Sequence, residues 1–306
     1  MDQNRMPLVE ALQQFREEAP AYFRIPGHRF ERGLDETLNG ASLAAYDLSE
    51  AEGLDDLHHA EGVIAEAQRL AAETWKAKKT FFLVNGTTCG NEAMVLSSVK
   101  EGEKIIVPRN VHKSVLMGLI LSGATPVYVM PEYSTKWQMW GGVTPETIEK
   151  AFAETPDAKA VLLVSPTYYG LCSDLQAIAE ICHCHNAALL VDEAHGSHLY
   201  FSEQLPPGAL ESGADACAQS IHKTAGSFTQ SSFLSLGSGR LDEARVAANL
   251  QMVQSTSPSY LLMAEKSEWN ARWNSARGRG RSLQRSKESK FLGPRWKERA
   301  AYGRST

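Results

Sequence analysis

Short apolar runs recur along the first 264 residues, and stretches with apolar positions at helical spacing lie between them. Residues 7–18 and 61–75 carry apolar side chains three to four positions apart, as a helix with one buried face does. The runs show no alternation between apolar and polar positions, which is typical of strands buried on both faces. They span 80–84, 104–108, 126–130, 160–166 and 187–193, and a further strand is expected at 214–219.

The order of these elements predicts the fold class. Strand and helix alternate, which favours an α/β fold with a mostly parallel sheet and helices on both faces. Thr144 followed by Pro145 predicts a helix start, because threonine is a good N-cap and proline fits the first helical position. A further helix is expected after Asp174, and segment 137–142 is expected to be a loop between units.

Polar sequences follow five of the predicted strands. In open α/β sheets, binding sites lie at the carboxyl ends of the strands, so these sequences are expected to converge on one site. They are NGTTCGNE from residue 85, RNVHKS from 109, SPTYYG from 165, DEAHGSH from 192 and SIHKTAGS from 220.

The first of these sequences is a candidate phosphate site. It lies between a strand and a helix start, where free backbone amides favour an anion and the hydroxyls of Thr87 and Thr88 add donors. Taken alone, the segment favours a capped turn without a ligand. The sequence contains no GxxxxGK[ST], which excludes a nucleotide P-loop and with it the helicase interpretation of DEAH at 192–195.

No metal site is predicted. His195 and His198 are candidate ligands near a strand end, but nothing else in the sequence supports them. Residues 182–185, Cys-His-Cys-His, resemble a zinc site. Four consecutive side chains fan out around a helix axis, however, and do not converge on one ion.

A lysine and a carboxylate complete a different kind of site. Asp192 ends a buried strand, where a carboxylate needs a positive partner. Lys223 lies among small residues, where desolvation favours the amine that forms a Schiff base. Pyridoxal phosphate requires a phosphate cradle, an amine, a carboxylate for its ring nitrogen and a flat side chain on its ring. Thr87 with Thr88, Lys223, Asp192 and His112 can fill these roles.

These residues resemble the Orn/Lys/Arg decarboxylases, which are bacterial basic-amino-acid decarboxylases with the aspartate aminotransferase fold (fold type I). The resemblance covers about residues 6–264. It implies a major domain that binds pyridoxal phosphate over 61–264, after an N-terminal segment, 1–60. The matching sequences are AQSIHKTAGSFTQSS at 218–232, GLDDLHHAEGVIAEAQ at 53–68, PGH at 26–28, NGTT at 85–88, RNVHKS at 109–114, SPTYYG at 165–170 and VDEAHG at 191–196.

The resemblance implies a role for each site residue. Lys223 is expected to bind the cofactor's aldehyde, Asp192 its ring nitrogen and His112 the face of its ring, while His195 is expected near its phenolic oxygen. The phosphate is expected to be surrounded by Thr87, Thr88, Cys89, Ser220 and His222. Cys89 stands where relatives commonly have a hydroxyl residue, which predicts a weaker phosphate bond at this position.

The implied reaction is decarboxylation of arginine, lysine or ornithine to the corresponding amine and carbon dioxide, by a homodimer or a larger homo-oligomer. Two alternatives remain open at this point. One is another fold type I reaction such as transamination, against which the SIHK sequence argues. The other is a truncated fragment without catalytic activity.

The distribution of charge separates the last 42 residues from the rest. Residues 265–306 contain 12 Lys and Arg and 4 Asp and Glu, a balance of +8, whereas the other residues hold 19 basic and 32 acidic groups, a balance of −13. This segment is expected to be a disordered or aberrant tail, for example the product of a frameshift. A competing hypothesis is that its Arg and Trp residues bind nucleic acid.

The tail replaces the small C-terminal domain of the family, which is expected to be missing. The chain is also expected to begin directly with the cofactor-binding region. Five cysteines, no secretory signal and no apolar run long enough for a membrane span favour reduced thiols and a cytoplasmic location.

Overall fold

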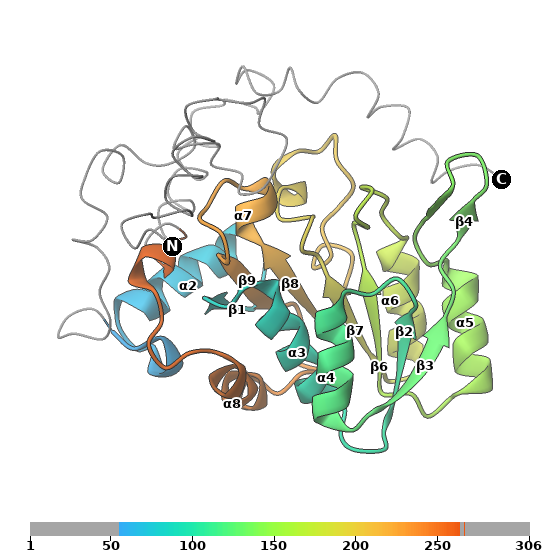
Figure 1. Ribbon diagram of the computed structural model, residues 1–306, viewed down its shortest axis with the longest axis horizontal. Helices are drawn as coiled ribbons and strands as arrows, with labels where there is room; N and C mark the ends of the chain where they lie inside the picture. The colour runs from blue at the N-terminus through green and yellow to red at the C-terminus, as the bar shows by residue number, and fades with distance from the viewer. Residues whose placement is uncertain (1–54, 264–265, 267–306) are drawn as a thin grey trace, which may run out of the picture.

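A seven-stranded sheet lies between two layers of helices in the computed structural model, which describes residues 55–263 and residue 266 (Figure 1). The main-sheet strands are β1 (Lys79–Leu83), β2 (Lys104–Pro108), β3 (Thr125–Val129), β6 (Ala160–Val164), β7 (Ala188–Asp192), β8 (Ala216–Ser220) and β9 (Ser232–Leu236). The α-helices are α2 (Val63–Thr74), α3 (Gly86–Ser98), α4 (Lys113–Ser122), α5 (Pro145–Glu154), α6 (Leu175–Cys184), α7 (Ile221–Thr224) and α8 (Glu243–Val253). The short 3-10 helices are η2 (Leu57–His59) and η3 (Leu199–Phe201).

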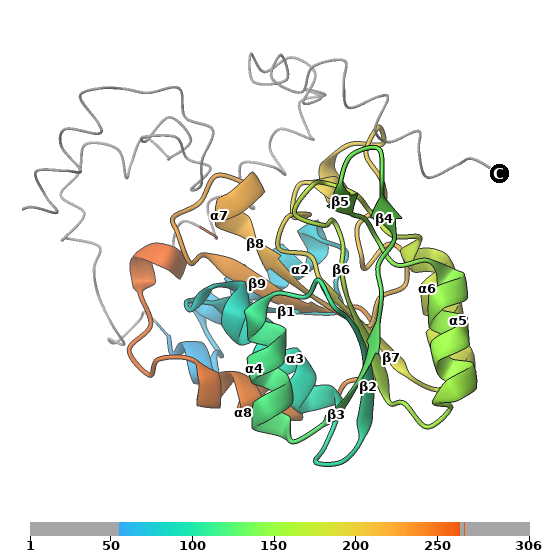
Figure 2. The same cartoon turned by 45° about the vertical axis from the view of Figure 1, so that its right-hand side comes forward.

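The sheet confirms the predicted α/β class. Its strand order is β1-β9-β8-β7-β6-β2-β3, and β9 runs antiparallel to both of its neighbours while the other pairs are parallel. Helices α3, α4 and α8 cover one face, and α5 and α6 cover the other (Figure 2). The carboxyl ends of β1, β2, β6, β7 and β8 therefore point to the same edge of the sheet.

The six predicted strands are confirmed, but β9 and a small two-stranded hairpin were not expected from the sequence. Strand β9, with the sequence SFLSL, has serine at two buried positions, so it lacks the continuous apolar character of β6 and β7. The segment 137–142 is not wholly a loop, because Met139–Trp140 forms β5 and pairs with β4 (Tyr133–Ser134) in a small hairpin.

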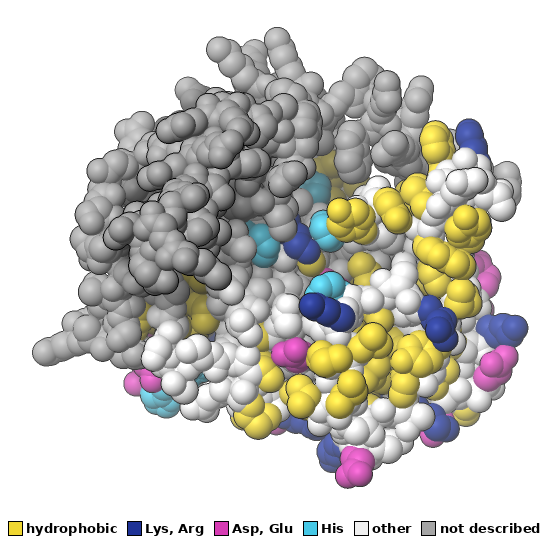
Figure 3. Space-filling view, viewed as in Figure 1, with side chains coloured by type: hydrophobic (Ala, Val, Ile, Leu, Met, Phe, Trp, Pro, Cys, Tyr) yellow, Lys and Arg dark blue, Asp and Glu magenta, His cyan; other side chains and the backbone are white. Residues whose placement is uncertain are grey.

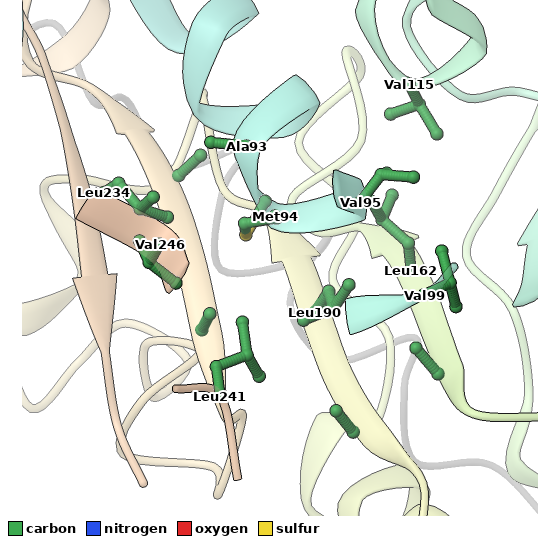
Figure 4. Close-up of a cluster of buried hydrophobic side chains, with 14 of the residues drawn as sticks. Ala93, Met94, Val95, Val99, Val115, Leu162, Leu190, Leu234, Leu241 and Val246 are labelled. Atoms are coloured by element: carbon green, nitrogen blue, oxygen red, sulfur yellow. The ribbon is translucent and has the colours of Figure 1, made fainter. Parts of the chain in front are cut away.

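Apolar clusters hold the helices onto both faces of the sheet. On one face, Met94 and Val95 of α3 lie against Leu162 of β6 and Leu190 of β7, and all four side chains are fully buried (Figure 4). On the other face, residues of α5 and α6 form a second cluster with β6 and β7. Burial of each large side chain contributes roughly 1.5–3 kcal/mol, so both faces fix the positions of the strand ends.

Helix starts follow the predicted caps. Thr144 Oγ1 accepts the backbone N–H of Thr147 at 3.3 Å, and Asp174 Oδ1 accepts that of Ala177 at 3.2 Å. Residues 61–75 contain α2, as predicted. The helix expected over 7–18, the PGH sequence at 26–28 and all of the basic segment except Lys266 lie outside the described residues.

The carboxylate of Asp55 organises the start of α2. It accepts backbone N–H groups from Asp56, Glu61, Gly62, Ile64 and Ala65 at 2.8–3.3 Å. Partial burial opposes ionisation, but these backbone N–H groups outweigh it and hold the pKa of Asp55 below its ordinary value. A charged acceptor at a helix N-terminus also interacts favourably with the helix dipole.

We therefore expect Asp55→Ala to lower the free energy of unfolding by about 1–2 kcal/mol at neutral pH. Because the folded-state pKa is depressed, this contribution is present above the pKa of the unfolded chain and is lost as the pH falls through the folded-state pKa. Urea titrations at several pH values test this, with Glu180→Gln on the exposed face of α6 as the control. An equal loss from Asp55→Ala at all pH values would contradict the electrostatic explanation.

Within the described residues, no helix is both long enough and apolar enough to cross a membrane.

Residues 182–185 fan out around α6 as expected from helical geometry. Cys182 is buried in the core, His183 Nε2 lies 3.0 Å from Asp215 Oδ2, and Cys184 is exposed.

Candidate active site

The polar sequences that follow the strands meet at one edge of the sheet. Asp192 is the last residue of β7, and Ser220 is the last residue of β8. Helix α3 begins after β1, and His112 caps α4 after β2. Histidine side chains and a basic side chain gather on this part of the surface (Figure 3). The convergence expected from the strand ends is therefore present in the structure.

Asp192 is a buried carboxylate with amide partners. Its side chain is only 3% exposed, its Oδ2 accepts from Asn91 Nδ2 at 2.8 Å, and its Oδ1 accepts from the backbone N–H of Ala194 at 3.2 Å. Burial raises the pKa of Asp192, while these two hydrogen bonds and the charges of Lys223 and His112 act in the opposite direction. Both hydrogen-bond donors are neutral, so the carboxylate still favours a cationic partner.

Lys223 and His195 lie side by side. Lys223 belongs to the one-turn helix α7, and its Nζ is 3.3 Å from His195 Nε2. Burial lowers the pKa of Lys223, and the charge of Asp192 opposes this shift. Burial, followed by the charge of Lys223, lowers the pKa of His195 to about 4, so this imidazole is neutral at physiological pH. The ring of Tyr168 lies edge-to-face with His195, with centroids 5.6 Å apart.

His112 is held by its own helix. As the N-cap of α4, it accepts the backbone N–H of Ser114 at its Nδ1 at 3.2 Å, and the same nitrogen lies 2.8 Å from Ser114 Oγ. Two contacts on one ring nitrogen fix the orientation of the imidazole.

A cluster of hydroxyl groups lies at the start of α3. Thr87 Oγ1 is 2.6 Å from Ser220 Oγ and 3.2 Å from Ser232 Oγ, and all three residues are buried. Gly86 has φ +69°, in the left-handed region that glycine favours, and its N–H donates to Gln230 O at 3.0 Å. This turn places the first amides of α3 beside the hydroxyl cluster, as an anion site requires.

The other predicted phosphate residues differ in their placement. Thr88 is exposed on the first turn of α3. His222 is buried, and its Nδ1 lies 3.0 Å from Ser231 O. The Cys89 thiol is fully buried in the apolar core and donates to Gly86 O at 3.1 Å, and burial raises its pKa to about 12. Its side chain therefore faces the core, and a contact of this residue with phosphate would have to come from its backbone.

Two polar residues of the site were not singled out from the sequence. Asn91 lies one helical turn after Thr87, a spacing that places both on one face of α3 and could have identified it. Ser114 lies two residues after His112, a common spacing for an N-cap contact. Both are 1% exposed.

Glu193, next to Asp192, serves a separate network. Its carboxylate accepts from Tyr200 Oη at 2.9 Å, from the backbone N–H of Ala209 at 2.7 Å and from Gln219 Nε2 at 2.8 Å. Burial raises its pKa to about 7. The two adjacent carboxylates of the DEAH sequence thus have different partners, and Glu193 ties the loop after β7 to β8.

Lys266 is the residue of the basic segment 265–306 that the structure describes, and it is buried. Its Nζ donates to Leu83 O at 2.6 Å and lies 5.3 Å from the centroid of the Phe82 ring. Burial lowers the pKa of Lys266 to about 7. The composition of the segment predicted a disordered or aberrant tail, and no sequence signal distinguished this lysine from its neighbours.

Comparison with known proteins identifies the family. The family description "Orn/Lys/Arg decarboxylase, major domain" matches residues 6–289. The chain belongs to the Orn/Lys/Arg decarboxylase family. This membership confirms the resemblance expected from the sequence, and the match extends beyond residue 264, where that resemblance was expected to end.

Individual decarboxylases are similar over most of this chain. Arginine decarboxylase of Halalkalibacterium halodurans is 44% identical over 265 residues, which cover 86% of this chain and 54% of that protein. Arginine decarboxylase of Bacillus subtilis is 42% identical over 267 residues, with the same coverage of both. The chain thus spans about half the length of these relatives.

Solved structures of the family share the fold. Lysine decarboxylase A of Pseudomonas aeruginosa superposes with a TM-score of 0.66 at 25% identity, and the match covers 87% of this chain and 39% of that one. This similarity confirms the predicted fold type I major domain.

Proposed function

We propose that this chain binds pyridoxal phosphate and catalyses decarboxylation of a basic amino acid, with arginine as the first substrate to test. One observation carries the proposal: the amine of Lys223, 3.3 Å from His195, shares a sheet edge with the buried carboxylate of Asp192. The names of the arginine decarboxylases at 42–44% identity support the choice of substrate.

The described residues fit this cofactor. The hydroxyls of Thr87, Ser220 and Ser232 and the first amides of α3 form a donor set suited to a phosphate. Asp192 offers a buried carboxylate to a protonated ring nitrogen. Lys223 offers an amine with a lowered pKa.

When bound, pyridoxal phosphate supplies an electron-poor ring that accepts the electron pair left by departing carbon dioxide. The residues of the chain supply the amine, the hydrogen-bonding groups and the orientation. The lowered pKa of Lys223 favours its unprotonated, nucleophilic form. Asp192 stabilises a proton on a cationic donor that faces it, and neutral His195 can accept or donate a hydrogen bond beside the lysine. The ring of His112 is held by Ser114, and it helps to orient the cofactor ring that binds at Asp192.

Carbon dioxide release tests the reaction. The purified chain, supplied with pyridoxal phosphate, is incubated separately with arginine, lysine and ornithine, and Lys223→Ala serves as the blank. We expect release above the blank from at least one substrate, and the most from arginine. Cofactor binding without release from any of the three would contradict the proposed activity.

We also propose that the active form is a homodimer or a larger homo-oligomer. Apolar side chains are exposed on α4 and β3, including Ile120 (71%), Leu121 (60%) and Tyr128 (47%), and hydrophobic side chains gather over this region (Figure 3). Exposed apolar patches commonly mark protein–protein contacts.

Sedimentation equilibrium tests this association. Replacing both Ile120 and Leu121 with lysine is expected to shift the protein toward the monomer, because two charges would have to be desolvated in the contact. Met252→Lys, at a 70% exposed apolar position on α8, is the matched control and is expected to leave the mass unchanged. A double variant that associates like the unmodified chain would exclude this face as the contact.

A further inference from the structure

We infer that Asn91 and Ser114 are positioning residues that connect the carboxylate of Asp192 to the imidazole of His112 through one directed chain of hydrogen bonds. This chain fixes His112 in the tautomer that has no proton on Nδ1. The functional part of the inference rests on the proposed function, because Asp192 and His112 are the residues proposed to meet the cofactor ring. The hydrogen-bond chain itself is a property of the protein alone.

The chain of contacts is short and buried. Asn91 Nδ2 lies 2.8 Å from Asp192 Oδ2 and 2.9 Å from Ser114 Oγ. Ser114 Oγ lies 2.8 Å from His112 Nδ1. Both intermediate residues are 1% exposed, so water does not compete with these bonds.

The chemistry of each group sets the direction of the chain. An ionised carboxylate only accepts, so the Asn91 amide must present its NH₂ group to Asp192. The reversed amide would place Oδ1 against the carboxylate oxygen, which is repulsive. The second N–H of the same NH₂ group then donates to Ser114 Oγ. The single hydroxyl proton of Ser114 is left for His112 Nδ1.

The direction determines the histidine tautomer. His112 Nδ1 receives the Ser114 hydroxyl proton and also the Ser114 backbone N–H, at 3.2 Å. A nitrogen that accepts from two donors carries its lone pair, so the ring proton of the neutral imidazole lies on Nε2. The ionised state of Asp192 and the tautomer of His112 are thereby coupled through two side chains.

An orphaned atom supports a positioning role for Asn91. Among the described residues, Asn91 Oδ1 is buried without a hydrogen-bond partner. Such an atom is destabilising, so a residue whose purpose was stability alone would be a poor choice here. Asn91 also belongs to α3, the helix that carries Thr87, and its contact with Ser114 sets α4 relative to the carboxyl end of β7.

Nitrogen-15 NMR of the histidine-labelled, cofactor-free protein tests the chain directly, with His112→Gln used to assign the signals. We expect His112 to show an unprotonated Nδ1 and a protonated Nε2. Ser114→Ala, which keeps the backbone N–H but removes the hydroxyl, is expected to move both signals toward those of exchanging tautomers. Ser114→Thr, which restores a hydroxyl, is expected to return them.

A matched pair between α3 and α8 provides the control. Asn249 Nδ2 donates to Ser97 Oγ at 2.9 Å, and this pair is also buried. Ser97→Ala and Asn249→Ala are expected to leave the His112 signals unchanged. Protonated Nδ1 in the unmodified protein, or unchanged signals in Ser114→Ala, would overturn the inference.

Titration with pyridoxal phosphate then measures whether the hydrogen-bond chain contributes to cofactor binding. Asn91→Ala and Ser114→Ala are expected to weaken cofactor binding by a factor on the order of ten, the usual effect of losing a hydrogen bond to a charged or oriented group. Asn249→Ala and Ser97→Ala are expected to bind normally. Unweakened binding in Asn91→Ala would overturn the positioning role. If the unmodified protein binds no cofactor while its NMR signals behave as expected, the proposed function fails and the hydrogen-bond chain stands.

Discussion

Replacing Lys223 with alanine is expected to abolish the covalent attachment of pyridoxal phosphate and carbon dioxide release together. The Lys223 amine lies beside His195, and its lowered pKa favours the unprotonated amine that the proposed attachment requires. Alanine cannot replace this amine, so release is expected to fall by a factor on the order of 10³ or more.

The measurement combines a visible absorbance spectrum with a carbon dioxide assay on folded protein. Lys159→Ala, an exposed lysine just before β6 at the opposite edge of the sheet, is the control and is expected to change neither readout. Substantial turnover by Lys223→Ala would remove this residue from the mechanism.

Asp192→Asn is expected to have opposite effects on activity and on stability. Asparagine keeps the shape of the side chain but has no charge to hold a proton on a cofactor nitrogen, so carbon dioxide release is expected to fall by about 10²–10³-fold. Burial raises the folded-state pKa of Asp192, which means that the ionised carboxylate destabilises the cofactor-free protein.

The sign of the pH dependence follows from this shift. Between the unfolded-state and folded-state pKa of Asp192, the folded chain binds more protons, so stability falls as the pH rises. Asp192→Asn removes this loss and is expected to raise the free energy of unfolding at neutral pH, with little change at acidic pH. Urea titrations of the cofactor-free protein measure it, and Asp157→Asn on the surface is the control. A variant less stable at neutral pH than the unmodified chain would contradict the assignment of Asp192 as a strained functional group.

Much of the fold and part of the site could be predicted from the sequence, for identifiable physical reasons. Strands β6 and β7 are buried on both faces and are continuously apolar, which makes them recognisable. Asp192 and Lys223 follow such strands, and the parallel arrangement brings the strand ends together. Strand β9 was missed because serines occupy two of its buried positions and interrupt the apolar run, and one of them, Ser235, pairs with the hydroxyl of Thr80 on β1.

Orientation and long-range contacts could not be predicted in the same way. Whether Cys89 faces the phosphate or the core depends on the exact start of α3, and the structure places its thiol in the core. The contacts of Asn91 with Asp192 and Ser114 join residues from three elements, so no local pattern reveals them. Burial of Lys266 likewise depends on a contact with Leu83, far away in the chain.

Lys266 provides an internal comparison for the role proposed for Lys223. It is fully buried and its pKa is lowered to about 7, so more of its amine is unprotonated at neutral pH than in an ordinary lysine. A lowered pKa alone therefore does not single out Lys223. What distinguishes Lys223 is its position beside His195 and at the same sheet edge as Asp192.

The most direct measurement is borohydride reduction of the unmodified chain in the presence of pyridoxal phosphate, followed by peptide mass spectrometry. Reduction makes the bond between the cofactor and its lysine permanent, so the modified peptide identifies the residue. We expect a single major label on Lys223. A label on Lys266, or no stoichiometric label on any lysine, would contradict the proposed role of Lys223.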